Sequence, residues 1–218
     1  MHLNQTYPIT DILNLPIEID RFIIDANIHK NQRANIIINH SNHLVMLDAL
    51  FGYLTQQEQQ CNLYKRYSTY TTPVDNIMTR PMWSKALGEY HCAIPVTGFY
   101  KWKQEHPQAT PYYYQPKDNQ IAYLAGFYNF NETNSNYSFS VLTCASQMQS
   151  QKEEHGMPLV MNYEQAMAWL DNDTSNIFAP FPATSFQSQQ VCRIVARRNM
   201  KDFQRISRVY KKKRRKKT

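Results

Sequence analysis

The run from Cys92 to Lys103, CAIPVTGFYKWK, constrains the fold of this chain more than any other segment. Its first half is apolar, and in its second half the side chains alternate between two faces, as in a strand. Gly98 stands between the halves, where the backbone must turn sharply or another segment must approach it closely. The run therefore predicts two consecutive strands. Composition alone favours a solvent-exposed Lys101, although a lysine among three aromatic residues is an unusual feature of a simple hairpin.

The rest of the chain shows a strand-rich pattern with a few short helices. Runs rich in Ile, Val, Tyr and Phe are bounded by Asn, Gly and Pro, which are typical turn residues. Gly88 is expected to end the first helix and Asn162 to cap the second. We expect strands at 34–38, 44–47, 112–115, 122–128, 137–143 and 190–195, and helices at 82–87 and 164–170. This order predicts an α+β domain built largely from antiparallel sheets, with short peripheral helices.

The composition is that of one globular domain without a nucleotide cofactor. The chain has 218 residues, of which 42% are hydrophobic and 19% are charged, so a sizeable core is possible. Glycine is scarce, and no Gly-rich phosphate-binding run is present. We therefore predict a single domain over 1–208 and no cofactor.

The cysteines are far apart in the sequence, at Cys61, Cys92, Cys144 and Cys192. A zinc site normally uses close pairs of ligands, so this spacing predicts no metal site. No secretory segment is recognisable, and no apolar stretch is long enough to cross a bilayer. We expect reduced, buried cysteines in a cytoplasmic protein without a membrane partner.

A run of seven basic residues at 211–217 carries the whole charge surplus of the chain. The formal net charge is +7, and without these residues 17 basic and 17 acidic residues remain. Such a run repels itself, so we predict a disordered polybasic tail over 209–218. The tail can neutralise nucleic-acid phosphates without reading sequence. A solubility tail and an anionic membrane contact are the alternatives.

Several short motifs stand in the same order as in a known family. They include NIHKNQ at 27–32, CAIPVTGFYKW at 92–102, LAGFY at 124–128 and HGMPLV at 155–160. Together they resemble the SRAP family, whose members are described as SOS response-associated peptidases and as proteins that crosslink to abasic sites in DNA. The resemblance implies an SRAP-like fold, in which largely antiparallel sheets form a barrel-like core.

The resemblance also implies a chemistry that this sequence lacks in part. Members of the family begin Met-Cys-Gly-Arg. After Met removal, the α-amine and thiol of the Cys trap the aldehyde of an abasic sugar in single-stranded DNA as a thiazolidine. This chain begins Met1-His2, without a thiol there and with a residue that disfavours removal of Met1. The family Glu of G-F-Y-E-W is Lys101, which reverses the charge, and a Trp that would meet DNA is missing from ALFGY at 49–53.

Other family positions are altered as well. The Asn, Arg and Glu of the family's N-A-R-x-E-T segment fall on Thr71, Pro73 and Asp75. His155 falls at the family His, although an ungapped alignment places Glu154 there instead. The resemblance therefore implies family-equivalent catalytic positions at Met1, Thr71, Lys101 and His155.

Two amines near this implied site can attack an aldehyde. They are the α-amine of Met1 and the side chain of Lys101. Burial beside another cation lowers the pKa of an amine and makes it nucleophilic at neutral pH. One hypothesis is therefore a reversible trap that holds abasic sites through an imine.

The sequence favours a second hypothesis, a binding protein that has lost the crosslinking chemistry. Such a pseudoenzyme would bind single-stranded DNA or RNA in a DNA-damage or SOS-type response, with Tyr67, Tyr70 and Trp83 as candidates for stacking on bases. A protein-interaction module without a nucleic-acid role is the third hypothesis. The sequence leaves open whether the chain is an enzyme and identifies no protein partner. The candidate nucleic-acid contacts are Lys65, Arg66, Arg80, Lys211, Lys212, Lys213, Arg214, Arg215, Lys216 and Lys217.

Overall fold

The structure is a computed structural model, and it describes residues 1–7, 16–53, 70–103, 109–132, 135–144, 156–175, 177, 179 and 182–191. The basic tail, Lys65, Arg66, Tyr67, Glu154, His155, Cys61 and Cys192 lie outside the described residues.

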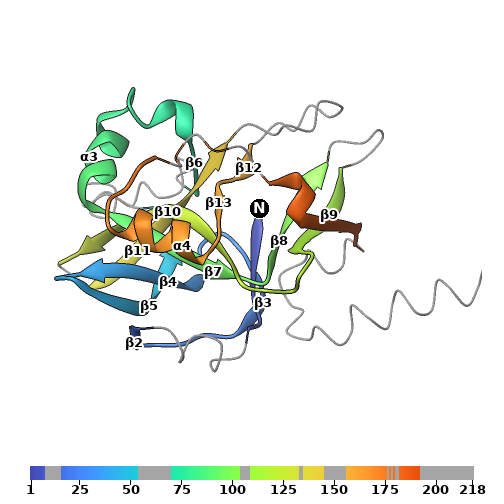
Figure 1. The fold of residues 1–218 in the computed structure, drawn as a ribbon, viewed down its shortest axis with the longest axis horizontal. Helices are drawn as coiled ribbons and strands as arrows, with labels where there is room; N and C mark the ends of the chain where they lie inside the picture. The colour runs from blue at the N-terminus through green and yellow to red at the C-terminus, as the bar shows by residue number, and fades with distance from the viewer. Residues whose placement is uncertain are drawn as a thin grey trace, which may run out of the picture.

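A nine-stranded sheet forms the larger part of the fold (Figure 1). Its main path runs β12-β11-β10-β7-β4-β5-β2, while β13 pairs with β10 and β6 with β11. Most neighbours are antiparallel, but β2 and β5, β5 and β11, and β6 and β11 are parallel pairs. Its strands are β2 (Ile17–Ile19), β4 (Arg33–His40), β5 (His43–Phe51), β6 (Thr71–Pro73), β7 (His91–Val96), β10 (Ala122–Asn131), β11 (Asn136–Cys144), β12 (Met157–Pro158) and β13 (Val160–Met161).

A five-stranded antiparallel sheet contains the N-terminus. Its order is β14-β9-β8-β1-β3, so the first strand of the chain lies inside the sheet. The strands are β1 (His2–Gln5), β3 (Asp25–Ile28), β8 (Gly98–Lys103), β9 (Thr110–Pro116) and β14 (Phe186–Gln190). The two halves of the run at 92–103 form consecutive strands in different sheets, because β7 belongs to the larger sheet and β8 to the smaller one.

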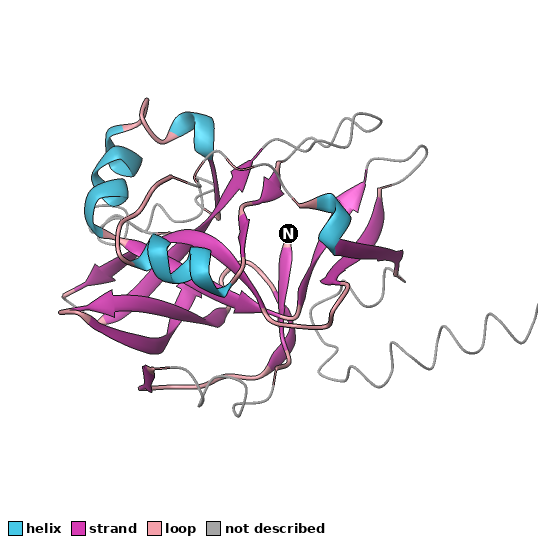
Figure 2. Cartoon of the chain, in the orientation of Figure 1, coloured by secondary structure: helices cyan, strands magenta, loops and turns pink. Residues whose placement is uncertain are grey.

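Helices are few and peripheral (Figure 2). Among the described residues, the α-helices are α3 (Pro81–Glu89) and α4 (Tyr163–Leu170), and the 3₁₀ turns are η2 (Val74–Asn76) and η3 (Ala183–Ser185). Asn162 caps α4 as expected, because its side chain accepts from the backbone N–H of Gln165 while the Gln165 side chain accepts from that of Asn162. The α4 helix packs on β7 and β10, where the Trp169 indole donates to the Cys92 carbonyl at 3.1 Å.

The predicted α+β class, with largely antiparallel sheets and short peripheral helices, is confirmed. Several details differ from the sequence prediction. The α3 helix continues through Gly88 to Glu89, because Gly88 faces open space and the Tyr90 N–H still bonds to the Ala86 carbonyl. Trp83 is 3% exposed and packs in the core, so it does not offer a ring to a nucleic-acid base.

The last strand lies earlier than predicted. It spans Phe186–Gln190 rather than 190–195, of which 192–195 lie outside the described residues. Its side chains after Phe186 are polar and exposed, so no apolar alternation marks the strand in the sequence. Pairing with β9 at the edge of the smaller sheet, and not propensity, makes this segment a strand.

Candidate functional site

A buried glutamine ties strand β1, which lies inside the smaller sheet, to two strands of the larger sheet. The Gln5 amide donates to the carbonyls of Asn35 at 2.8 Å and Pro95 at 2.9 Å, and accepts from the Asn35 N–H at 2.8 Å. On the other side, β1 pairs with β8, with Leu3 opposite Phe99 and His2 opposite Tyr100. These contacts hold the N-terminus near the middle of the molecule, next to β8 (Figure 1).

Gly98 is required by close approach and not by an unusual backbone angle. A Cβ atom built there would lie 2.4 Å from the Tyr114 carbonyl oxygen and 2.5 Å from the Tyr113 hydroxyl. No real side chain tolerates such distances, so only glycine lets β8 lie this close to β9. The Tyr113 hydroxyl also accepts a bond from the Asn4 amide at 2.9 Å, which ties β1 to the same place.

Three amines gather at the start of β1: the Met1 α-amine, the Lys30 side chain and the Lys101 side chain. We call them the amine cluster. Burial, and then the positive charges of Lys30 and Lys101, lower the pKa of the Met1 amine from 8.0 to about 5. At neutral pH this amine is therefore mostly unprotonated and can act as a nucleophile.

Lys101 is buried and does not point into solvent, contrary to what composition favours. The residue is 5% exposed, and its ammonium donates to the Gly156 carbonyl at 2.7 Å. Gly156 is the residue after His155 in the sequence, and His155 itself lies outside the described residues. A Cβ at Gly156 would lie 2.5 Å from the Cys144 carbonyl oxygen, which shows how closely this segment packs.

Aromatic and imidazole rings line the site beside the amine cluster. The His2 ring lies 3.8 Å from that of His29 and 4.5 Å from that of Trp102, between ring centroids. Burial, followed by His29 and the neighbouring amine, lowers the pKa of His2 to about 3, although a hydrogen bond to Asn27 opposes the shift. His2 is thus a neutral imidazole at physiological pH and adds no positive charge.

Lys30 is held by an aromatic ring. Its ammonium lies 4.5 Å from the centroid of the Tyr70 ring, and the Tyr70 hydroxyl donates to the Asn31 side chain at 3.2 Å. Thr71 follows Tyr70 and is half-buried in β6. None of the ion pairs among the described residues involves Met1 or Lys30, since both described pairs join arginines to Asp48.

Sequence reasoning missed Lys30, His2 and His29 as members of this site. The NIHKNQ motif contained the signal, because His29 and Lys30 stand where the resembled motif has Ala and Pro. Their convergence with Lys101 depends on pairing between β1 and both β3 and β8, which no local pattern reveals.

Comparison with models of protein families shows which family the chain belongs to. The family model of SOS response associated peptidase (SRAP) matches residues 10–198, most of the chain. The chain belongs to the SRAP family. Outside this match lie the twenty C-terminal residues, which include the basic run, and β1 with its amine.

Curated relatives of this SRAP protein have related names. The abasic site processing protein YMR114C of Saccharomyces cerevisiae is 27% identical over 112 residues, which cover 50% of this chain and 30% of the yeast protein. The abasic site processing proteins YobE and YoqW of Bacillus subtilis are 24% and 23% identical over 139 residues, 59% of this chain. The matched regions cover 64% and 62% of those two proteins, so in each case they span less than two thirds of the relative.

Solved structures share the SRAP protein's fold. A protein from Bacteroides thetaiotaomicron superposes with a TM-score of 0.73 at 18% identity and covers 91% of this chain and 99% of its own. A protein from Bordetella bronchiseptica gives a TM-score of 0.69 at 13% identity, with 88% of this chain and 99% of its own covered. At such identities the likeness concerns the fold alone.

The remaining predicted site residues of this SRAP protein are spread over the fold. Arg80 precedes α3 and is exposed, and Asp75 is exposed in η2.

The described cysteines are buried thiols, as expected. Burial raises the pKa of Cys92 well above its usual value, and the Cys144 thiol donates to the Met157 carbonyl at 3.6 Å. Within the described ranges there is no cluster of His, Cys, Asp and Glu that could hold a metal, and no helix is long and apolar enough to cross a membrane.

Proposed function

We propose that this protein binds single-stranded DNA at abasic sites and holds the ring-opened sugar as a reversible imine on the amine cluster. The observation that carries the proposal is the Met1 amine, with its pKa lowered to about 5, beside Lys101 and Lys30. The names of the matched relatives, abasic site processing proteins, supply the substrate class. The role belongs to a DNA-damage or SOS-type response.

The chemistry needs an unprotonated amine and an aldehyde. The amine nitrogen attacks C1′ of the open sugar and forms a C–N bond, and the aldehyde oxygen takes up a proton. The resulting carbinolamine then loses its hydroxyl group and one hydrogen of the nitrogen as water. A C=N bond remains. The positive charges of Lys30 and Lys101 attract the phosphates that flank the lesion.

Thiazolidine formation needs a nitrogen and a sulfur on adjacent carbons of one residue. Met1 and His2 carry no thiol, and the Cys144 thiol is buried and bonded to backbone carbonyls. The product on this protein is therefore an imine that water reverses, and not a stable crosslink. This is the sense in which we propose that the protein lacks the crosslinking activity implied by the resemblance.

Lys101 is the alternative nucleophile. Its side chain is buried near the Met1 amine, but its ammonium is engaged with the Gly156 carbonyl. An ammonium held in this way is better suited to lowering the pKa of the Met1 amine and to holding an anion than to attacking carbon. His155, next to Gly156, and Thr71, next to Tyr70, are proposed to complete the site.

Further basic residues are proposed to contact the nucleic-acid backbone. They are Lys65, Arg66, Arg80 and the run at 211–217, each adding a phosphate contact that steepens the salt dependence of affinity. RNA is a second possible strand for these contacts, since they read charge and not the sugar. A cytoplasmic location accords with this proposal.

Borohydride trapping tests the proposal. The full chain is incubated with single-stranded DNA with and without an abasic site, with and without borohydride, and adducts are counted on a denaturing gel. We expect an adduct only with the abasic strand and only with borohydride. Intact-mass analysis first verifies that Met1 carries a free amine, and peptide mapping of the reduced adduct then identifies the modified nitrogen.

Matched variants assign the nucleophile. Acetylation of the Met1 amine should abolish the adduct, Lys101→Met should leave a weaker one, and Lys85→Met, which removes an exposed lysine on α3, should change nothing. An adduct that survives with both Met1 blocked and Lys101 replaced would reject the imine trap. Absence of binding to any oligonucleotide at low salt would favour the protein-interaction module instead.

A further inference from the structure

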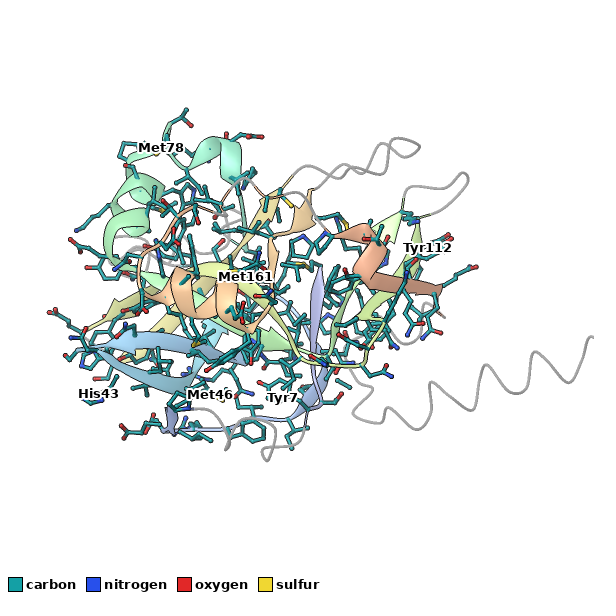
Figure 3. The ribbon with its side chains drawn as sticks, viewed as in Figure 1. Tyr7, His43, Met46, Met78, Tyr112 and Met161 are labelled. Carbon is teal, nitrogen blue, oxygen red and sulfur yellow. The ribbon has the colours of Figure 1, made fainter. Side chains whose placement is uncertain are left out.

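A cavity of about 620 Å³ lies outside the amine cluster and shares no residue with it. It is formed where the β9–β10 connection, β13, the start of α4 and η3 meet. Met161, labelled in Figure 3, lies at its wall beside α4. The role proposed above does not use this cavity.

Primary amides dominate the polar lining of the cavity. The oxygens of Asn162 and Gln165 accept the backbone N–H groups of the α4 capping box, and the oxygen of Asn119 accepts from Gln115 at 3.4 Å. Within the described residues, the amide nitrogens of Asn119, Asn162 and Gln165 have no hydrogen-bond partner. The cavity therefore offers N–H donors that can bind neutral acceptors, such as ring nitrogens and carbonyls, of a ligand.

Aromatic rings supply the apolar walls. Tyr163 is 36% exposed, although most large hydrophobic residues of the protein are buried, and its ring lies 6.2 Å from that of Tyr123. Phe186, the first residue of β14, also lines the cavity. Such rings bind flat ligands by stacking.

The charge of the lining selects the class of ligand. Among the described residues that line the cavity, Asp118 is the one charged group, and none is Lys, Arg or His. A phosphate or carboxylate would find no positive partner there. A flat, neutral ring with both acceptors and N–H donors matches the amides, the Asp118 carboxylate and the aromatic walls together.

We propose that this cavity binds a nucleobase, either from a free nucleoside or from a nucleotide of the strand held at the amine cluster. Binding of a nucleotide from the strand held at the amine cluster rests on the proposed function. The distance between the two sites allows such binding. Gly156, which accepts from Lys101, and Met161, which lines the cavity, are five residues apart, or at most about 18 Å along the chain. A base a few nucleotides from the lesion can span that distance.

Calorimetry and saturation-transfer NMR with the full chain test the first source. The probes are deoxyadenosine, deoxyguanosine, deoxycytidine and thymidine. We expect at least one to bind and Tyr163→Ala to weaken it about fivefold or more, because a stacking ring is lost. Tyr163→Phe should retain binding, and Ile24→Ala, which removes another exposed apolar side chain outside the cavity, should not alter it.

The second source is tested with two abasic strands, one with ordinary flanking nucleotides and one whose flanking sugars lack bases. Tyr163→Ala should weaken binding of the first strand and leave the second unchanged. The proposal is overturned if no nucleoside binds and Tyr163→Ala affects both strands equally, or if nucleoside binding is indifferent to Tyr163→Ala. Borohydride adducts report separately on the amine cluster, so a failed base pocket leaves the proposed imine trap standing.

Discussion

The amine cluster and the amide-lined cavity differ in almost every physical respect, although the short segment 156–162 runs between them. The cluster gathers three amines around β1, and no described ion pair involves Met1 or Lys30. The cavity offers uncharged amides, aromatic walls and a single carboxylate. The first suits an aldehyde and phosphates, and the second suits a neutral ring. Our two proposals thus assign charge and covalent chemistry to one region and recognition of flat groups to the other.

The two regions also differ in how protonation affects their free energy. Like charges near one another disfavour the protonated form, and burial adds to this effect. The cluster therefore keeps its Met1 amine reactive at the expense of stability at low pH. The amides of the cavity do not titrate, so the hydrogen bonds that these amides offer should not change with pH.

A side chain at Gly98 should have the largest effect, because it disturbs the pairing of β8, the strand that carries Lys101 of the cluster. Gly98→Val places atoms within 2.4 Å of the Tyr114 carbonyl and forces β8 and β9 apart, which we expect to cost about 2–4 kcal/mol of unfolding free energy. Urea denaturation measures this. Gly88→Ala is the control, because a helical glycine facing open space should gain up to about 1 kcal/mol. Equal stabilities of the two variants would contradict the close-packing account.

The pH profile of borohydride trapping should separate the cluster amine from an ordinary one. With a pKa of about 5 instead of 8.0, roughly nine tenths of the amine is unprotonated at pH 6, against about 1% for an unperturbed amine. Adduct formation should therefore hold from pH 8 to 6 and fall only near pH 5. A decline that begins near pH 8 would show that the amine is not perturbed.

The lowered pKa of the Met1 amine also predicts how the free energy of unfolding changes with pH. Between pH 5 and 8 the unfolded chain binds more protons at the Met1 amine than the folded chain does, so the free energy of unfolding should rise with pH over that range. His2 should add a similar rise between pH 3 and 6.5. Acetylation of the Met1 amine should flatten the upper part of the profile. If acetylation leaves the slope of unfolding free energy against pH unchanged, another group takes up the proton on unfolding.

Lys101→Glu restores the negative charge that the SRAP motif carries at this position. It should lower the affinity of the amine cluster for DNA. Loss of one cation and gain of one anion should lower the affinity for single-stranded DNA about tenfold at low salt, with a smaller effect at high salt. It should also raise the pKa of the Met1 amine and shift the trapping profile toward higher pH. Lys101→Gln, which removes the charge alone, is the matched control and should show about half of the effect on a logarithmic scale.

Lys30→Ala should have the smallest effect. Lys30 is exposed and rests on Tyr70, so its loss should remove one phosphate contact. We expect affinity to fall a fewfold and the slope of log affinity against log salt to become shallower by about 0.7 for a single strand. Fluorescence anisotropy over a salt series measures this. Deletion of 211–217 should flatten the slope further if the tail touches DNA.

The strands around 92–103 and the α4 helix were predictable because their signals are local. Alternating apolar residues, a glycine at a close contact and an Asn cap each act within a few residues, and all three reappear in the structure. The same is true of Lys101 as an unusual residue, since a lysine between aromatic neighbours in a strand is visible in the sequence.

The sequence by itself determined the central strands, the two helices, the family resemblance and the absence of a thiol at position 2. It did not reveal β1, β2 and β3 near the N-terminus or the position of β14. The tertiary structure alone decided that Lys101 is buried, that Lys30 and the Met1 amine lie beside it, and that four side-chain amides meet in one cavity. These groups are separated by up to a hundred residues, and only the insertion of β1 between β8 and β3 brings the amines together. Charges act over a few ångströms of space, so their effect on the pKa of an amine depends on the folded distance and not on position in the chain.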